Sequence, residues 1–157
     1  MNKEKKVIDD IEFENASLMF NNFSGRASQY NRQGDRNFCV IIPNEQLAMQ
    51  LAEDGWNVKS RGANHEDEDE VTYYIQVKVK YNHDYPQFNP KIVLVSGDNK
   101  TELNEETVSI IDQIDIQSVD LVVRPRYYET VDRSGIAAYL RTMYVVQRVD
   151  RFASKYE

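Results

Sequence analysis

The stretch VTYYIQVKVKY at residues 71–81 decides the fold class, because it has the clearest periodicity in the chain. In an extended conformation one face carries Tyr73, Ile75, Val77, Val79 and Tyr81, and the other carries Tyr74, Gln76, Lys78 and Lys80. Alternation with a period of two is typical of an antiparallel strand with one buried face and one solvated face. The segment therefore predicts a strand with a polar, cationic outer face.

Other segments on both sides of this strand also have the composition of strands, at 12–23, 36–43, 56–59, 91–96, 118–124 and 136–147. The first two are joined by the polar stretch SGRASQYNRQGDR, which is typical of a hairpin connection. Pro125 is expected to interrupt the strand before it. The aromatic residues assigned to the core are Phe13, Phe20, Phe38, Tyr73 and Tyr81.

Two short helices are expected between the strands. Asn44 suits an N-cap and Gly55 suits the position after the last turn, which predicts a helix over 45–54. Asn104 suits the cap of a second short helix, with Val108 and Ile111 turned inward. Trp56 is expected to pack against the end of the first helix, and the acidic segment at about 60–70 is expected to form a surface loop.

Short strands joined by turns predict a β-sandwich or a small barrel. A barrel of about five strands with a helix between strands is the OB-type arrangement. We therefore expect a mainly β chain, an OB-fold-like β-barrel with two short helices. The 157 residues are expected to form one domain, because domains usually have roughly 100–200 residues.

Composition excludes several classes of protein. No apolar run approaches the roughly 18 residues of a membrane span, and the N-terminus lacks the apolar region of a secretory signal. The single cysteine excludes an internal disulfide framework, and a cytoplasmic location is expected.

The net charge is −7, but without the five acids at 66–70 the balance is 19 basic against 21 acidic residues. Net charge therefore does not decide what one face of the protein binds.

Signatures of enzymes are missing from the sequence. GxSxG, GxxxxGK[ST] and GxGxxG do not occur, and with only two histidines and one cysteine we expect no zinc site of several such ligands. Asp69 with Gln76 and Lys78 comes nearest to a metal-dependent nuclease, but Gln76 and Lys78 are explained as the outer face of a strand. We therefore expect no catalytic residue, no metal and no cofactor.

Cationic and aromatic residues instead gather in and beside the first connection, on the outer face of strand 71–81, around Pro125 and in the last strand. Single-stranded nucleic acid needs this combination, because cations follow the phosphates while each ring that stacks on an unpaired base contributes roughly 1–3 kcal/mol. The structural alternative is that these tyrosines half-bury at strand ends with their hydroxyl groups in water. The expected nucleic-acid-binding residues are Arg26, Tyr30, Arg32, Arg36, Tyr74, Lys78, Lys80, Arg124, Arg126, Tyr128 and Arg141.

Several of these segments resemble bacteriophage single-stranded DNA-binding proteins built on an OB-fold. The resemblance lies in residues 21–59, in YIQVKVKY, PKIVLVSG and VDLVVRPRYYE, and in GIAAYLRTMYVVQ, and it loosely covers residues 10–152. It implies a non-catalytic, sequence-tolerant protein that coats single-stranded DNA during phage replication and recombination in the host cytoplasm. The residues that it implicates are Arg26, Tyr30, Arg36, Tyr74, Lys78, Arg124 and Arg126.

The sequence departs from this resemblance at its end, and an alternative function stays open. Many such proteins end in an acidic tail that recruits replication partners, whereas this chain ends in RFASKYE. The acidic run Glu66–Glu70 predicts either a solvated loop, a substitute for that tail, or a DNA mimic in an acidic inhibitor of a host nucleic-acid enzyme. The sequence also leaves open replication or recombination proteins as partners, and self-association into a homo-oligomer.

Overall fold

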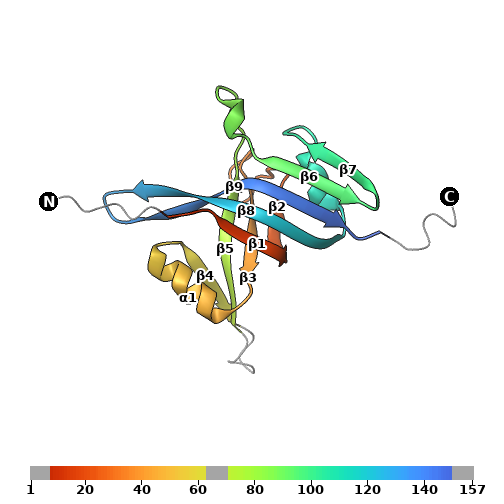
Figure 1. Cartoon of the computed structure of the whole chain (residues 1–157). Helices are drawn as coiled ribbons and strands as arrows, with labels where there is room; N and C mark the ends of the chain where they lie inside the picture. The colour runs from red at the N-terminus through yellow and green to blue at the C-terminus, as the bar shows by residue number, and fades with distance from the viewer. Residues whose placement is uncertain (1–7, 63–70, 150–157) are drawn as a thin grey trace.

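The computed structural model describes residues 8–62 and 71–149, and nine strands in these ranges form a single curled sheet (Figure 1). The strands are β1 (Ile11–Ala16), β2 (Leu18–Asn22), β3 (Arg36–Ile42), β4 (Val58–Gly62), β5 (Val71–Val79), β6 (Lys91–Ser96), β7 (Asn99–Leu103), β8 (Ile116–Glu129) and β9 (Ser134–Gln147). The helices are α1 (Glu45–Asp54) and the short 3-10 segments η1 (Pro86–Phe88) and η2 (Val108–Gln113). The expected fold class, mainly β and OB-fold-like with short helices, is confirmed.

The order of the strands shows how the sheet curls. Its main path runs β1-β8-β9-β5-β3-β2, and only Ser17 separates β1 from β2 along the chain. The two ends of the path are therefore successive pieces of one bent segment, which brings the sheet back on itself as a barrel requires. Along this path β5 and β9 are parallel and the other pairs are antiparallel.

The expected single strand at 12–23 is wrong in detail, because the segment bends and divides. β1 pairs with β8 and β2 pairs with β3, and each pairing contains a shift of register. Asn15 and Phe20 have positive φ values of 50° and 55°, which break the regular strand twist at these points. Phe20 was expected in the core, but the irregularity turns its side chain outward, where it is 53% exposed.

The strand at 71–81 is confirmed, and it occupies the centre of the sheet. Ile75, Val77 and Val79 are buried, while Lys78 and Lys80 are exposed. β3 pairs antiparallel with one edge of β5, from Arg36 opposite Val79 to Ile42 opposite Tyr73. β9 pairs with the other edge of β5. The cationic outer face of β5 therefore lies where β3, β5 and β9 meet.

The helix at 45–54 is confirmed together with its caps. The Leu47 backbone N–H donates to Asn44 Oδ1 at 2.7 Å, and Gly55 has a φ of 109°, which favours glycine. Trp56 is buried against the end of this helix, as expected. The second expected helix is a 3-10 segment, η2, whose Val108 and Ile111 are buried as predicted.

Two strands and the course of a third differ from the expectation. Val58–Gly62 pairs with β5, so residues 60–62 of the expected loop are strand, and the rest of that loop, with the acidic run Glu66–Glu70, lies outside the described residues. Asn99–Leu103 forms β7 on the edge of β6, although its polar sequence showed no strand periodicity. β8 continues through Pro125 because β1 reaches only to Val123, so that Pro125 pairs with β9 on one side.

The core fills the inside of the curled sheet. Phe23 and Phe38 stack with ring centroids 5.1 Å apart, and both are completely buried. Met143 from β9 and Ile111 from η2 join the same cluster. In the described part of the chain, no helix is long and apolar enough to cross a membrane.

Candidate nucleic-acid interface

A groove of three adjoining hollows crosses the outer face of the sheet at β5 and β9. The hollows have volumes of about 450, 300 and 700 Å³, and Lys80 and Tyr139 line all three. The groove is defined here by its cationic and aromatic side chains together with Gln76, and these are Tyr30, Arg36, Gln76, Lys78, Lys80, Tyr81, Phe88, Arg124, Arg126, Tyr127, Tyr128, Arg133 and Tyr139.

Tyr139 is the central ring of the groove, and cations approach it from two strands. It faces Lys78 in the parallel register between β5 and β9. The Lys78 ammonium lies 5.8 Å from the centroid of its ring, and the Arg126 guanidinium lies 5.6 Å from it. A ring that is flanked by cations is suited to hold a base by stacking while its phosphates meet the charges.

The loop at 82–90 adds two exposed rings at one end of the groove. Tyr85 and Phe88 are 57% and 53% exposed, and their centroids are 6.2 Å apart. The Arg124 guanidinium lies 5.9 Å from the centroid of Phe88. The Asn82 side chain fixes the loop by accepting hydrogen bonds from the backbone of Asp84 and Tyr85, each at 3.0 Å.

The connection at 23–35 forms another wall, and η2 anchors its start. Asp112 accepts hydrogen bonds from the Phe23 N–H at 2.9 Å, the Ser24 N–H at 2.8 Å and the Ser24 hydroxyl at 2.6 Å. Further on, Asn31 donates to the backbone carbonyls of Arg26, Arg32 and Asp35. These bonds give the connection a defined shape, from which Tyr30 projects into the groove with 90% exposure.

Arg36 lies in the groove wall but already has partners. Its Nε donates to the Phe23 carbonyl at 3.1 Å, and its guanidinium lies 5.6 Å from the Tyr81 ring centroid. Glu105 forms an ion pair with it at 3.9 Å. Arg36 therefore holds the connection at 23–35 to the barrel, besides contributing positive charge to the groove.

His83 titration should report the contact of loop 82–90 with Glu105. His83 Nε2 lies 2.6 Å from Glu105 Oε2, and the hydrogen bond and the charge of that carboxylate raise the pKa of His83 above 6.5. A raised folded-state pKa means that the contact stabilises the folded protein below pH 6.5, and that this contribution is lost as pH rises through the folded-state pKa. NMR titration of His83 is expected to give a higher midpoint in the wild type than in Glu105→Gln. Equal midpoints would contradict the contact.

The predicted residues divide between the groove and other surfaces. Those brought together in the groove are Tyr30, Arg36, Lys78, Lys80, Arg124, Arg126 and Tyr128. Arg26 and Arg32 lie in the connection at 23–35 but do not line the hollows, and Tyr74 lies further along β5. Alternation along the expected strand 136–147 predicts Arg141 on one face with Tyr139, Met143 and Val145. This prediction is wrong, because β9 bulges there, Met143 and Val145 are buried, and Arg141 pairs with Asp10 at 2.5 Å.

Sequence reasoning missed the central ring and the loop aromatics. Tyr139 lies in an apolar run, and its partner Lys78 is distant in the chain, so no local pattern marks it. Tyr85 and Phe88 belong to none of the expected strands, although aromatic residues near Pro86 and Pro90 are a signal that could mark an exposed loop.

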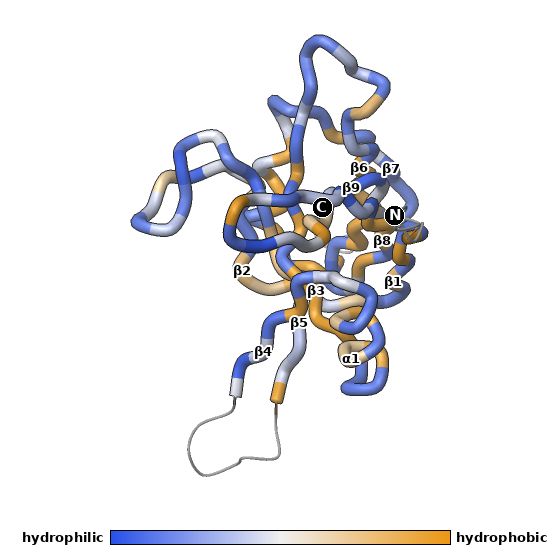
Figure 2. Tube along the Cα trace, turned by 90° about the vertical axis from the view of Figure 1, so that its left-hand side faces the viewer, coloured by the Kyte–Doolittle hydropathy of each residue, from blue (hydrophilic) through white to orange (hydrophobic). Residues whose placement is uncertain are grey.

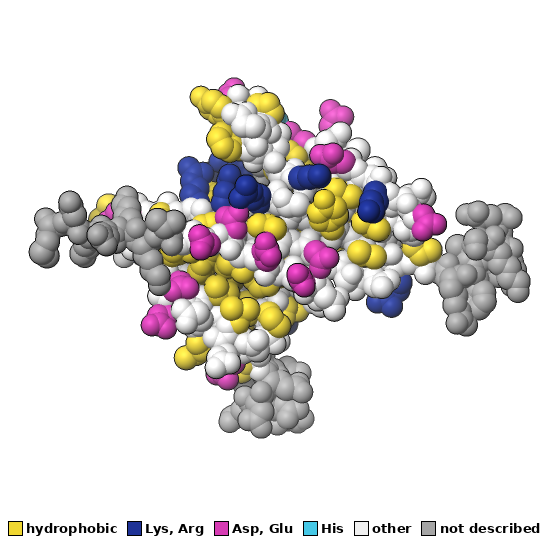
Figure 3. Space-filling model, in the orientation of Figure 1, with side chains coloured by type: hydrophobic (Ala, Val, Ile, Leu, Met, Phe, Trp, Pro, Cys, Tyr) yellow, Lys and Arg dark blue, Asp and Glu magenta, His cyan; other side chains and the backbone are white. Residues whose placement is uncertain are grey.

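The surface charge is divided between two regions (Figure 3). Lys and Arg side chains gather beside the base of loop 82–90, whereas Asp and Glu side chains form a row across the front of the molecule. β1 contributes the exposed Glu12 and Glu14, and Asp120 of the neighbouring β8 is also exposed. Positive charge is thus concentrated where the rings are, which favours a polyanion with exposed bases.

Residues 8–62 and 71–149 contain no group of three or more His, Cys, Asp or Glu side chains that could hold a metal ion. Asp69 of the nuclease-like constellation lies outside the described residues, while Gln76 and Lys78 line the groove. Burial raises the pKa of the Cys39 thiol to about 11, against the opposing charge of Lys59, so this cysteine is a poor nucleophile.

A curled β-barrel with a cationic groove of exposed rings on its face defines a protein of the single-stranded nucleic-acid-binding class. The chain belongs to the family described as "Putative phage ssDNA-binding domain", which it matches over residues 1–157. The resemblance seen in the sequence is thereby confirmed, as is the prediction that the protein is not an enzyme.

Solved structures of phage proteins share the fold. A C-terminal truncation of the single-stranded DNA-binding protein from bacteriophage Enc34 matches with a TM-score of 0.56 and 13% identity, over 90% of this chain and 87% of that chain. The Enc34 protein in complex with single-stranded DNA matches with a TM-score of 0.51 and 13% identity, over 92% of this chain and 89% of that chain. No curated protein matches the sequence.

Proposed function

We propose that the protein binds single-stranded DNA without sequence preference, through the groove around Tyr139, during phage DNA replication and recombination. The observation that carries this proposal is the placement of Lys78 and Arg126 at 5.8 and 5.6 Å from the centroid of one ring, Tyr139, that lines the groove. Family membership supports DNA as the ligand. The Enc34 protein, which shares the fold and has been solved in complex with single-stranded DNA, supports it as well.

The mechanism follows from the two kinds of side chain in the groove. Lys78, Lys80 and Arg126 neutralise phosphates, and this releases counterions and makes binding sensitive to salt. Tyr139 and Phe88 stack on bases, which requires bases that are not paired in a duplex. Every base has a π-face, so stacking selects single strands without reading their sequence.

The wider role rests on the same groove. One hydrophobic cluster joins strands of the sheet with α1 and η2, which supports a single binding domain. A protein of this kind covers transient single strands in the cytoplasm of the infected host. Replication or recombination proteins and further copies of the chain are its proposed partners.

Fluorescence anisotropy with a labelled oligo-dT of about 30 nucleotides tests the proposal. Titration at low and moderate salt is expected to show binding that weakens as salt rises. Duplex DNA of equal length is expected to bind more weakly, because its bases are already stacked and paired. Equal affinity for duplex, or no binding at low salt, would contradict the proposed function.

A further inference from the structure

Phe20 is held outside the core by an irregular backbone. Met19 pairs with Cys39 and Asn22 with Asn37, so that Phe20 and Asn21 together oppose the single residue Phe38. This is the two-against-one arrangement of a β-bulge, and bulges often redirect a side chain beside a functional site. The φ of 55° at Phe20 is a conformation that costs a bulky residue free energy. The chain therefore holds a large apolar ring in solvent in a strained conformation.

Two strands build a cationic surround for this ring. The Arg61 guanidinium of β4 lies 5.5 Å from the Phe20 centroid, and Tyr74 of β5 meets Phe20 edge-on at 6.0 Å and 69°. Lys59 pairs with Tyr74 across the sheet, so its side chain lies on the same face. We call Phe20, Tyr74, Arg61 and Lys59 the Phe20 platform. It repeats the combination of ring and cations found around Tyr139.

The platform and the groove lie on one face of β5. Tyr74, Gln76 and Lys78 alternate with the buried positions, so all three side chains point to the same side of the sheet. Gln76 lines the groove, and Tyr74 is the next outward residue beyond it. Tyr74 lies four positions before Lys78 in the strand, so the two residues are about 14 Å apart at a rise of about 3.4 Å per residue. Figure 2 shows β4 and the start of β5 extending side by side from the body of the molecule, and Lys59 and Arg61 on this face are exposed.

We propose that the Phe20 platform is a second stacking site, which holds bases of the same DNA strand after it leaves the groove along β5. The inference rests on the proposed function of the groove and adds to it a direction for the strand. Phe20 stacks on a base, and Arg61 and Lys59 meet the adjacent phosphates. A short oligonucleotide fills the groove alone, whereas a longer one also reaches the platform.

Phe20→Gly separates a role in binding from a role in folding. Glycine adopts positive φ without strain, so the variant is expected to unfold at the same temperature as the wild type or higher. The same variant is expected to bind an oligo-dT of about 16 nucleotides roughly tenfold more weakly, because a stacking contact is lost. Its affinity for an oligo-dT of about 6 nucleotides is expected to stay within about twofold of the wild type.

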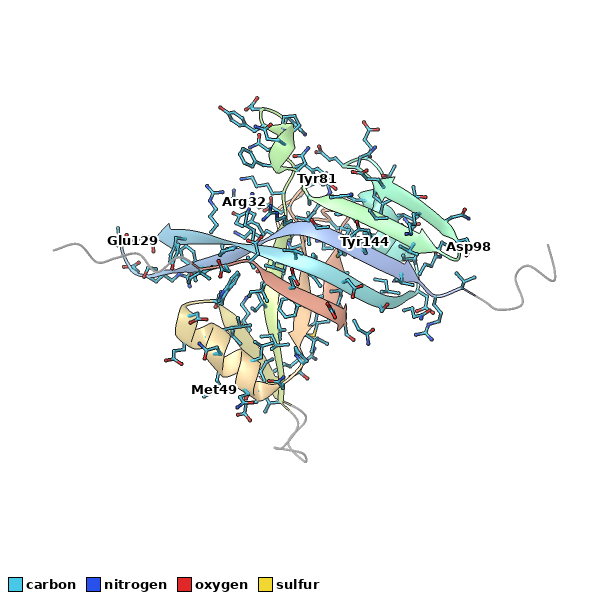
Figure 4. The ribbon with its side chains drawn as sticks, viewed as in Figure 1. Arg32, Met49, Tyr81, Asp98, Glu129 and Tyr144 are labelled. Carbon is cyan, nitrogen blue, oxygen red and sulfur yellow. The ribbon has the colours of Figure 1, made fainter. Side chains whose placement is uncertain are left out.

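Phe20→Trp reports contact with DNA directly. Its fluorescence is expected to be quenched by the longer oligonucleotide and not by the shorter one, while the native Trp56 is 3% exposed and stays shielded. The matched control is Met49→Trp on α1, at a position that is 63% exposed and away from the β5 face (Figure 4). The fluorescence of the Met49→Trp variant is expected to stay unchanged when either the longer or the shorter oligonucleotide is added.

The outcomes separate the platform from the groove. If Phe20→Gly binds both lengths as the wild type does, or if Phe20→Trp is not quenched by the longer strand, the platform proposal is overturned while the groove stands. If the wild type binds neither length, the proposed function fails first. Weaker binding of the longer strand alone, by a variant that is at least as stable as the wild type, supports the platform.

Discussion

Replacing Tyr139 by alanine is expected to weaken binding of single-stranded DNA by about 1–3 kcal/mol, the contribution of one base-stacking ring. Tyr139 lines all three hollows of the groove, so no other ring occupies so central a position among the described residues. Alanine removes no charge, and the dependence of log Kobs on log salt is therefore expected to stay unchanged. Tyr139→Phe is expected to retain most of the affinity, because stacking needs the ring and not the hydroxyl group.

Tyr144→Ala is the matched control for this variant. Tyr144 also belongs to β9 and is 38% exposed, but it lines a separate hollow with Glu12, Glu14 and Asp120 (Figure 4). Anisotropy titrations with oligo-dT are expected to give wild-type affinity for Tyr144→Ala. Equal losses in the two variants would show that the groove does not carry the binding.

The double variant Lys78→Gln and Lys80→Gln is expected to flatten the salt dependence of binding. Each phosphate contact contributes about −0.7 to the slope of log Kobs against log salt on a single strand, so two lost contacts change it by about 1.4. Affinity for oligo-dT and oligo-dC is expected to fall by the same factor, because phosphate contacts carry no sequence information. Titrations at several salt concentrations measure both effects.

Lys100→Gln provides the control for charge alone. Lys100 is exposed on β7 and lines none of the three hollows of the groove. Its replacement is expected to leave the slope close to that of the wild type. If Lys100→Gln changes the slope of log Kobs against log salt by half as much as the double variant does, each lysine has the same effect wherever it lies. The DNA would then be attracted by positive charges spread over the whole surface and not by the groove.

Patterns among neighbouring residues are sufficient to predict the strand and the helix that those neighbouring residues determine. The strand β5 follows from the alternation of its side chains, and α1 follows from Asn44 and Gly55 at its ends. The cations Lys78 and Lys80 were found because they share the outer face of that strand. These features depend on residues close together in the sequence, and for this reason the sequence predicts them.

Features that depend on distant pairing were not predictable in this way. Tyr139 becomes central only because β9 lies parallel to β5, and a bulge in the same strand turns Arg141 toward Asp10. A second bulge, in β2, moves Phe20 from its expected core position to the surface. β7 is an exposed edge strand, and its polar residues have no buried face to show a period.

The bent segment that joins the two ends of the sheet also governs when the molecule can form. Asn15 contacts Asp120 across a separation of 105 residues, so the pairing of β1 with β8 must wait until β8 has been synthesised. Long-range pairing of this kind slows folding, because a large loop must close before its contacts are made. The last strand, β9, also supplies Tyr139. A growing chain on the ribosome therefore acquires its barrel and the groove proposed to bind DNA together, once β9 has been synthesised.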